Sequence, residues 1–128
     1  MVPSYNRKPS QLEFLSVAEK LVITSVRNGE QIAKRHRFFG AMEPYNLSTK
    51  MYNCLVSANR RNVFSDFAIR QDYLNKALDY LECLSSQVSL LKLYTELDSK
   101  KWDNWGKLIS EERALIKGII DSDIERQK

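Results

Sequence analysis

Residues 73–118 read YLNKALDYLECLSSQVSLLKLYTELDSKKWDNWGKLISEERALIKG, and this stretch decides the fold class. Apolar residues recur in both of its halves at steps of three and four, a spacing typical of a buried helical face and not of a strand. Between the halves, Leu97-Asp98-Ser99 leaves room only for a short turn, with Asp98 or Ser99 as the N-cap of the second helix. The stretch therefore predicts two antiparallel helices. The residues of the first stripe are Leu74, Ala77, Leu81, Leu84, Val88 and Leu91, and those of the second are Trp102, Trp105, Ile109, Ile116 and Ile119.

The rest of the chain supplies helices that can pair with this hairpin. The 128 residues suffice for one domain, and 4 Gly and 3 Pro favour an all-helical chain over a sheet with many turns. Ser10-Gln11-Leu12-Glu13 has the form of a capping box, which opens a first helix. We predict an all-α, up-down-up-down antiparallel four-helix bundle. Its helices span about 10–37, 45–64, 70–97 and 99–120, residues 1–9 form an arm, and residues 121–128 form a fraying tail.

The residues needed for a metal site or an active site are missing from the sequence. Cys54 and Cys83 lie far apart and His36 is the single histidine, so the four close ligands of a zinc site are absent. We expect both cysteines to be reduced, largely buried thiols. Neither a nucleophile–base pair nor a glycine-rich phosphate loop is present. The sequence therefore favours a non-catalytic binding protein with no metal, no cofactor and no small-molecule substrate. No apolar run approaches about 18 residues and the N-terminus is unlike a signal peptide, so we expect a soluble intracellular protein without a membrane span.

Charge is unevenly distributed along the chain. Residues 1–76 contain 12 Lys and Arg against 6 Asp and Glu, whereas residues 77–128 contain 8 against 10, so net charges of +6 and −2 make up the +4 of the whole. A basic half attracts polyanions. The alternatives are that cations at a helix end have a purely structural role and that the others are solvated surface. The candidate contacts to nucleic acid or to a protein partner are Arg27, Lys34, Arg35, Arg37, Lys50, Arg60, Arg61 and Arg70.

Two of the predicted helices contain apolar residues outside their main stripes. In the helix over 10–37, Phe14 and Leu21 lie about a third of a turn from the main line, so that helix is either central in the bundle or meets another subunit. In the helix over 70–97, Leu90, Leu93 and Leu97 lie almost opposite the buried stripe. We interpret these five residues as oligomer contacts. Glu112 falls on the apolar stripe of the last helix, and the sequence leaves open whether it faces a cation across an interface or lies at the edge of the stripe.

These elements together resemble one known family. The capped first helix, the loop Phe38-Phe39-Gly40, the arginine-containing second helix and the hairpin over 77–118 resemble the accessory variability determinants of diversity-generating retroelements. More distantly, they resemble the four-helix-bundle proteins encoded in ribosomal-RNA intervening sequences. The resemblance covers about residues 10–120 and rests on the pattern and order of the elements. Relatives often have Phe-Pro where this chain has Phe39-Gly40.

The resemblance implies a function that composition alone does not reach. It implies a protomer that assembles into a homopentameric barrel with a positive surface, in the cytoplasm of a bacterial host. It also implies binding of a reverse transcriptase and of RNA and DNA, in support of mutagenic retrohoming. The alternative from the residues alone is a helical adaptor whose basic face binds an acidic protein and no nucleic acid.

Overall fold

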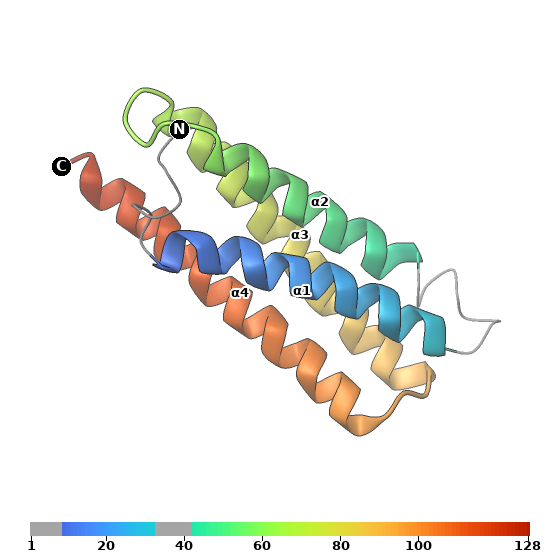
Figure 1. The fold of residues 1–128 in the computed structure, drawn as a ribbon. Coiled ribbons are helices and arrows are strands. Elements are labelled where there is room, and N and C mark those ends of the chain that lie inside the picture. Colours follow the sequence, from blue (N-terminus) through green and yellow to red (C-terminus); the bar gives the residue numbers. More distant parts are fainter. Residues whose placement is uncertain (1–8, 33–41) are drawn as a thin grey trace.

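The computed structural model describes residues 9–32 and 42–128, and these residues form an all-helical four-helix bundle without strands (Figure 1). The predicted fold class is therefore confirmed at the level of the bundle. The helices are α1 (Pro9–Gln31), α2 (Glu43–Asn59), α3 (Phe67–Tyr94) and α4 (Ser99–Arg126).

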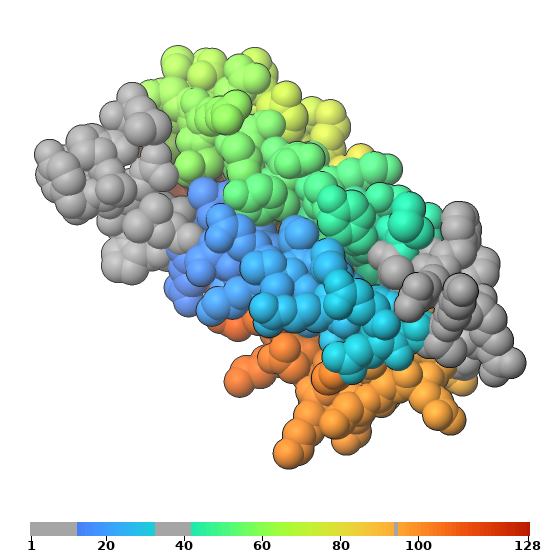
Figure 2. Space-filling model, turned by 45° about the vertical axis from the view of Figure 1, so that its right-hand side comes forward, coloured from blue at the N-terminus to red at the C-terminus, as the bar shows by residue number. Residues whose placement is uncertain are grey.

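The helices alternate in direction along the bundle. In Figure 1, α1 and α3 run one way and α2 and α4 run back. Each helix packs against the two that flank it in the ring α1, α2, α3, α4. Figure 2 shows α1 between α2 and the first half of α4 on one face of the molecule. This arrangement places α2 and α3 side by side.

The core consists of the apolar stripes that the sequence predicts. Every residue of both stripes of the hairpin is buried, and Trp102 stacks on Trp105 with ring centroids 6.0 Å apart. Side chains of α1 and α2 complete the core, because each bundle helix must bury one face against its neighbours. Those from α1 and α2 in the core cluster are Phe14, Ala18, Leu21, Ile32, Met51, Leu55 and Ala58.

The short turn before α4 follows the prediction closely. Thr95 has an extended backbone and ends α3, and its hydroxyl donates to the carbonyl of Leu91 at 2.6 Å. Asp98 is the N-cap of α4, and its carboxylate accepts a hydrogen bond from the backbone N–H of Lys100 at 2.9 Å. Asp98 thereby satisfies one of the free amides at the helix start. Of the two predicted candidates, Asp98 is the N-cap and Ser99 is the first residue of α4.

The limits of α2 and the start of α3 differ from the prediction. α2 begins at Glu43, earlier than the predicted Tyr45, because proline is tolerated in a first turn and Pro44 does not delay it. α2 ends at Asn59 and not near 64. The side chain of Asn62 accepts hydrogen bonds from the backbone N–H groups of Phe64 at 2.8 Å and Ser65 at 3.0 Å, which replaces helical bonding with a turn. α3 then begins at Phe67, before the predicted residue 70.

The predicted fraying tail is wrong, because α4 continues to Arg126. Ile119 and Asp123 are both buried, so the inward face of the helix continues past residue 120 to Asp123. The side chain of Gln127 also donates to the carbonyl of Val63 at 3.0 Å, which links the end of α4 to the turn after α2.

The first helix is shorter than predicted, since α1 ends at Gln31 and not at Arg37. It begins at Pro9, so Ser10 lies within its first turn, and the side chains of the predicted capping box at 10–12 lie outside the description. The last residue of the predicted arm over 1–9, Pro9, belongs to α1. Residues 1–8 and the Phe38-Phe39-Gly40 loop also lie outside the described residues.

Candidate nucleic-acid interface

Basic and aromatic side chains meet along the contact between α2 and α3. Lys50 is exposed on α2, and its Nζ lies 5.8 Å from the centroid of the Tyr80 ring on α3. Arg61 follows the end of α2, and its Cζ lies 5.7 Å from the centroid of the Tyr73 ring. Lys76 Nζ lies 5.8 Å from the same Tyr73 centroid. We call these five residues the α2–α3 ladder.

The backbone around the ladder explains how its members come together. Tyr73 and Tyr80 are seven residues apart, close to two helical turns, so both point to the same side of α3. Both rings are half-buried against the core. α2 runs antiparallel beside them, which brings its Lys50 to Tyr80 and brings Arg61, two residues after its end, to Tyr73. A cation over an aromatic face is attracted by the ring quadrupole, at about 0.5–1 kcal/mol for exposed sites.

An acidic group, Asp72, lies beside the ladder. Asp72 pairs with Lys76 at 3.1 Å, one turn apart on α3, and both side chains are more than half exposed. This hydrogen bond and the charge of Asp72 raise the pKa of Lys76, which keeps the amine protonated. Exposed pairs of this kind contribute little to stability. The ladder therefore presents three cations, one of them loosely paired.

Only some of the predicted basic contacts lie at or next to the α2–α3 ladder. Lys50 and Arg61 belong to the ladder, and Arg60 is exposed beside Arg61 in the same turn. Arg27 is exposed on α1, whereas the ladder residues lie on α3, on α2 and just after the end of α2. The remaining predicted contacts on the first helix, Lys34, Arg35 and Arg37, lie outside the described residues.

Arg70 is not a surface contact, so its prediction is wrong. Only 6% of Arg70 is exposed, and its Nε lies 2.5 Å from an Asp123 carboxylate oxygen. Its two other nitrogens donate to the second Asp123 oxygen at 3.4 Å and to the Ala58 carbonyl at 3.0 Å. One guanidinium thus joins the end of α2, the start of α3 and the end of α4, which leaves no donor face for a phosphate.

Sequence reasoning missed Tyr73, Tyr80 and Lys76. The signal was present, since two tyrosines seven apart on one helix with a lysine three positions after the first share one face. This signal could not be interpreted without the alignment of α2 against α3. Only that alignment shows that Lys50 lies over Tyr80 and Arg61 over Tyr73.

The predicted oligomer contacts divide into two groups. Phe14 and Leu21 are 1% and 0% exposed inside one protomer, so they cannot meet another subunit, and that prediction is wrong. α1 has two apolar lines because it packs against both α2 and α4. Leu97 is half-buried against the same core. Leu90 and Leu93 are 50% and 81% exposed on the outer side of α3 and remain candidate contacts.

Glu112 lies inside the bundle, which contradicts both predicted placements at a stripe edge and at an interface. It is 0% exposed, and neither carboxyl oxygen has a hydrogen-bond partner in the part of the chain that the structure describes. Burial, assisted by the negative charges of Glu111 and Glu13, raises the pKa of the Glu112 carboxyl to about 9. The group therefore stays protonated and neutral at neutral pH. No substrate path reaches it, and it offers no surface chemistry.

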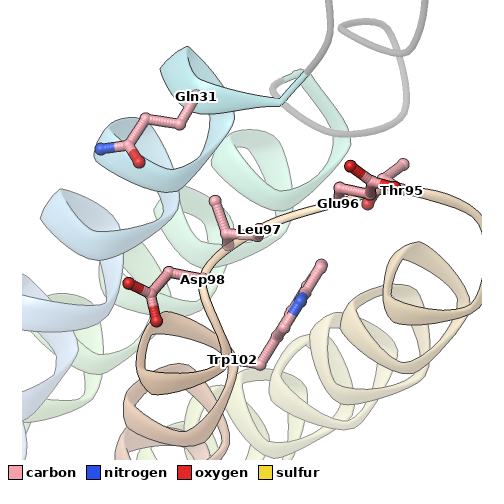
Figure 3. Close-up of a pocket in the computed structure, with 6 residues that line it drawn as sticks. All are labelled: Gln31, Thr95, Glu96, Leu97, Asp98 and Trp102. Carbon is pink, nitrogen blue, oxygen red and sulfur yellow. The ribbon is translucent and has the colours of Figure 1, made fainter.

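A second surface feature is an open hollow of about 580 Å³ at the α3–α4 turn (Figure 3). Gln31 from the end of α1 and Trp102 from the first turn of α4 flank it, and the linker completes the wall. Its charged lining side chains are the carboxylates of Glu96 and Asp98, which would repel a phosphate. The lining residues are Gln31, Thr95, Glu96, Leu97, Asp98 and Trp102.

Other kinds of site find no support in residues 9–32 and 42–128. These residues contain no group of three or more His, Cys, Asp or Glu side chains that could hold a metal ion. Cys54 and Cys83 are free, and Cys83 is exposed, so the prediction of two buried thiols is wrong for Cys83. No helix in the described ranges is long and apolar enough to cross a membrane.

Comparison with known proteins leaves the chain without an assigned family. No protein-family model matches it, and neither a curated protein nor a solved structure does.

Proposed function

We propose that this chain is a non-catalytic accessory protein that binds nucleic acid, and that it serves the reverse transcriptase of a diversity-generating retroelement. The observation that carries the binding function is the α2–α3 ladder. Its three cations, Lys50, Arg61 and Lys76, lie along the contact between α2 and α3, and Arg60 adds a fourth exposed cation at one end. Lysine and arginine on such a surface neutralise phosphates of RNA or DNA.

The retroelement role rests on the resemblance of the helices and their order to the accessory variability determinants. In this role the chain brings template RNA or cDNA to the reverse transcriptase in the bacterial cytoplasm and supports mutagenic retrohoming. Arg27, Lys34, Arg35 and Arg37 remain proposed contacts to the nucleic acid or to the polymerase.

A homopentameric barrel belongs to the same proposal. The exposed Leu90 and Leu93 support an oligomer, since apolar side chains on the outer side of a bundle helix favour a further neighbour. Assembly matters for binding because a net charge of +4 is modest for one chain and five copies multiply it. Light scattering of the purified protein and of Leu93→Glu tests this. We expect a pentameric mass that the substitution lowers, and a monomeric wild type contradicts it.

The binding function is tested with a 20-nucleotide RNA and a 20-base-pair duplex in an anisotropy titration over a salt series. We compare the wild type with K50Q/R61Q/K76Q. The triple variant K100Q/K107Q/K117Q is the matched control, because it removes the same charge from exposed positions on α4. Each lost phosphate contact lowers the salt slope by about 0.7 for single strands and about 0.9 for duplex DNA. We expect the ladder variant to lose affinity and slope while the control keeps most of both.

Two results would contradict this proposal. Binding that is absent for both nucleic acids, or that stays flat between low and moderate salt, would favour the adaptor that meets an acidic protein. Equal losses in the two triple variants would show that charge alone matters and that the ladder is not the site. The retroelement role is tested separately by asking whether a reverse transcriptase gene lies beside this one and whether its product co-purifies with the chain after nuclease treatment.

A further inference from the structure

The α2–α3 ladder contains two aromatic rings, Tyr73 and Tyr80, which phosphate binding alone does not require. Tyr73 and Tyr80 stand about 10 Å apart along α3, since seven residues rise 1.5 Å each. Both pack against the core on one side and remain partly exposed on the other. Their rings are therefore held in place before any ligand binds, which lowers the entropy lost on binding.

The cations lie beside the two rings along the contact between α2 and α3. Lys50 and Arg61 lie eleven residues apart on and just after α2, a separation of about 16 Å if the helical rise continues. Each lies over a tyrosine ring, and Lys76 reaches Tyr73 from α3 itself. Nucleotides in a stacked strand rise about 3.4 Å each along the strand axis, so the distance from Lys50 to Arg61 corresponds to a run of about five nucleotides.

Aromatic rings beside cations distinguish single strands from duplexes. In a duplex the base faces are stacked on one another, so the tyrosines would find no partner and only the cations would contribute. A single strand offers base faces for the rings and phosphates for the cations at the same time. Resting on the nucleic-acid-binding function proposed above, we propose that the surface along the contact between α2 and α3 binds single-stranded RNA or DNA, with bases stacked on Tyr73 and Tyr80 and phosphates paired with Lys50, Arg61 and Lys76.

Two other groups near the ladder, Asp72 and Cys54, are compatible with such a ligand. The ion pair between Asp72 and Lys76 is exposed at both ends, so a phosphate can replace the carboxylate at small cost. Cys54 on α2 is half-buried near Lys76, and burial raises the pKa of its thiol. A neutral thiol does not repel a phosphate. The cations now over the rings sit on flexible side chains, which can move to the phosphates when bases take their place.

The test uses three 12-nucleotide probes with the full-length protein in fluorescence anisotropy. The first is a single strand, used once as oligouridine and once as oligothymidine, so that binding to RNA and to DNA is measured separately. The second is a duplex with one strand of the same length, and the third is a strand of abasic sites that keeps the phosphates and removes the bases. We expect the wild type to bind the normal strand at least about tenfold more tightly than the abasic strand, because stacking is worth a factor of about five or more per base.

Ring-removing variants test the same proposal from the protein side. Y73L/Y80L should lose about tenfold or more in affinity for the normal strand and keep its affinity for the abasic strand and the duplex. Y73F/Y80F keeps both rings and should bind as the wild type does. Circular dichroism and urea unfolding show whether each variant is folded, and the abasic probe gives the answer with unaltered protein if the leucine variant is not.

The outcomes separate this inference from the function on which it rests. Equal affinity for normal and abasic strands, with the duplex bound at least as well, overturns the stacking of bases and leaves salt-dependent binding to the ladder intact. If none of the probes binds, the nucleic-acid function fails as well. Tighter binding of the single strand that disappears in Y73L/Y80L but not in Y73F/Y80F supports the inference.

Discussion

Asp123 and Glu112 are two buried carboxyl groups on the same inward face of α4, and only one of them has a partner. Eleven residues separate them, about three helical turns. Asp123 lies near the end of the bundle against the guanidinium of Arg70, with a closest contact of 2.5 Å. Glu112 lies in the middle of the core with no hydrogen-bond partner among the described residues.

The two positions show what burial does to a carboxyl group with and without a cation. A buried ion pair offsets the loss of hydration when its remaining donors are satisfied, as the third contact of Arg70 to the Ala58 carbonyl does here. A buried carboxyl alone avoids the charge by holding its proton, which explains the raised pKa of Glu112. The first arrangement joins three helices, whereas the second weakens the core at neutral pH.

The largest expected effect comes from breaking the pair. Asp123→Ala leaves the Arg70 guanidinium buried without its carboxylate, and we expect the free energy of unfolding to fall by about 3–5 kcal/mol. Urea unfolding at neutral pH measures this loss, which is a large part of the 5–15 kcal/mol typical of a domain. The double variant R70M/D123L is the control, because replacing both partners with apolar side chains should restore most of the stability. A loss of less than about 1 kcal/mol in D123A would show that the pair is solvated.

The opposite effect is expected at Glu112. Glu112→Leu removes a group that the unfolded chain ionises and the folded chain keeps neutral, so we expect the free energy of unfolding at pH 8 to rise by about 2–4 kcal/mol. Glu111→Leu is the neighbouring control, since Glu111 is exposed and its replacement should change stability by less than about 0.5 kcal/mol. Destabilisation by E112L would indicate that the carboxyl has a partner in solution.

The pH dependence of the difference between the wild type and Glu112→Gln sharpens the same comparison. The folded pKa is about 9 and the ordinary value is 4.5, so the folded protein binds more protons between these values. Its stability therefore falls as pH rises through this window, by at most about 1.4 kcal/mol per pH unit from this one group. The two proteins should be equally dependent on pH below about pH 4.5, and the variant should gain steadily up to pH 9. Urea unfolding in paired buffers measures the difference, and parallel pH profiles would refute the assignment.

The sequence predicted the parts of the fold that depend on local periodicity. The stripes of α3 and α4 and the Asp98 cap needed only the positions of residues within one helix or turn. Arg70 was misplaced on the surface because its partner, Asp123, is 53 positions away and lay in a segment predicted to fray. Phe14 and Leu21 were assigned to another subunit because a sequence shows two apolar lines but not whether both face the same core.

The candidate site was predictable only in part for the same reason. Lys50 and Arg61 could be named as cations, yet their place over Tyr80 and Tyr73 depends on how α2 and α3 are aligned. That alignment follows from packing across the whole bundle, which no short motif encodes.

A neutral buried pair provides the smallest of these tests. The indole N–H of Trp105 on α4 donates to the hydroxyl of Ser25 on α1 at 3.2 Å, and both residues are fully buried. Ser25→Ala removes the acceptor and leaves a buried donor unsatisfied, so we expect a loss of about 1–2 kcal/mol in urea unfolding. Unlike the Glu112 effect, this loss should be the same at pH 5 and pH 8, because neither group titrates in that range. A loss that varied with pH would mean that Ser25 acts through the ionisation of Glu112, and the stability effects of Ser25 and Glu112 would then be coupled.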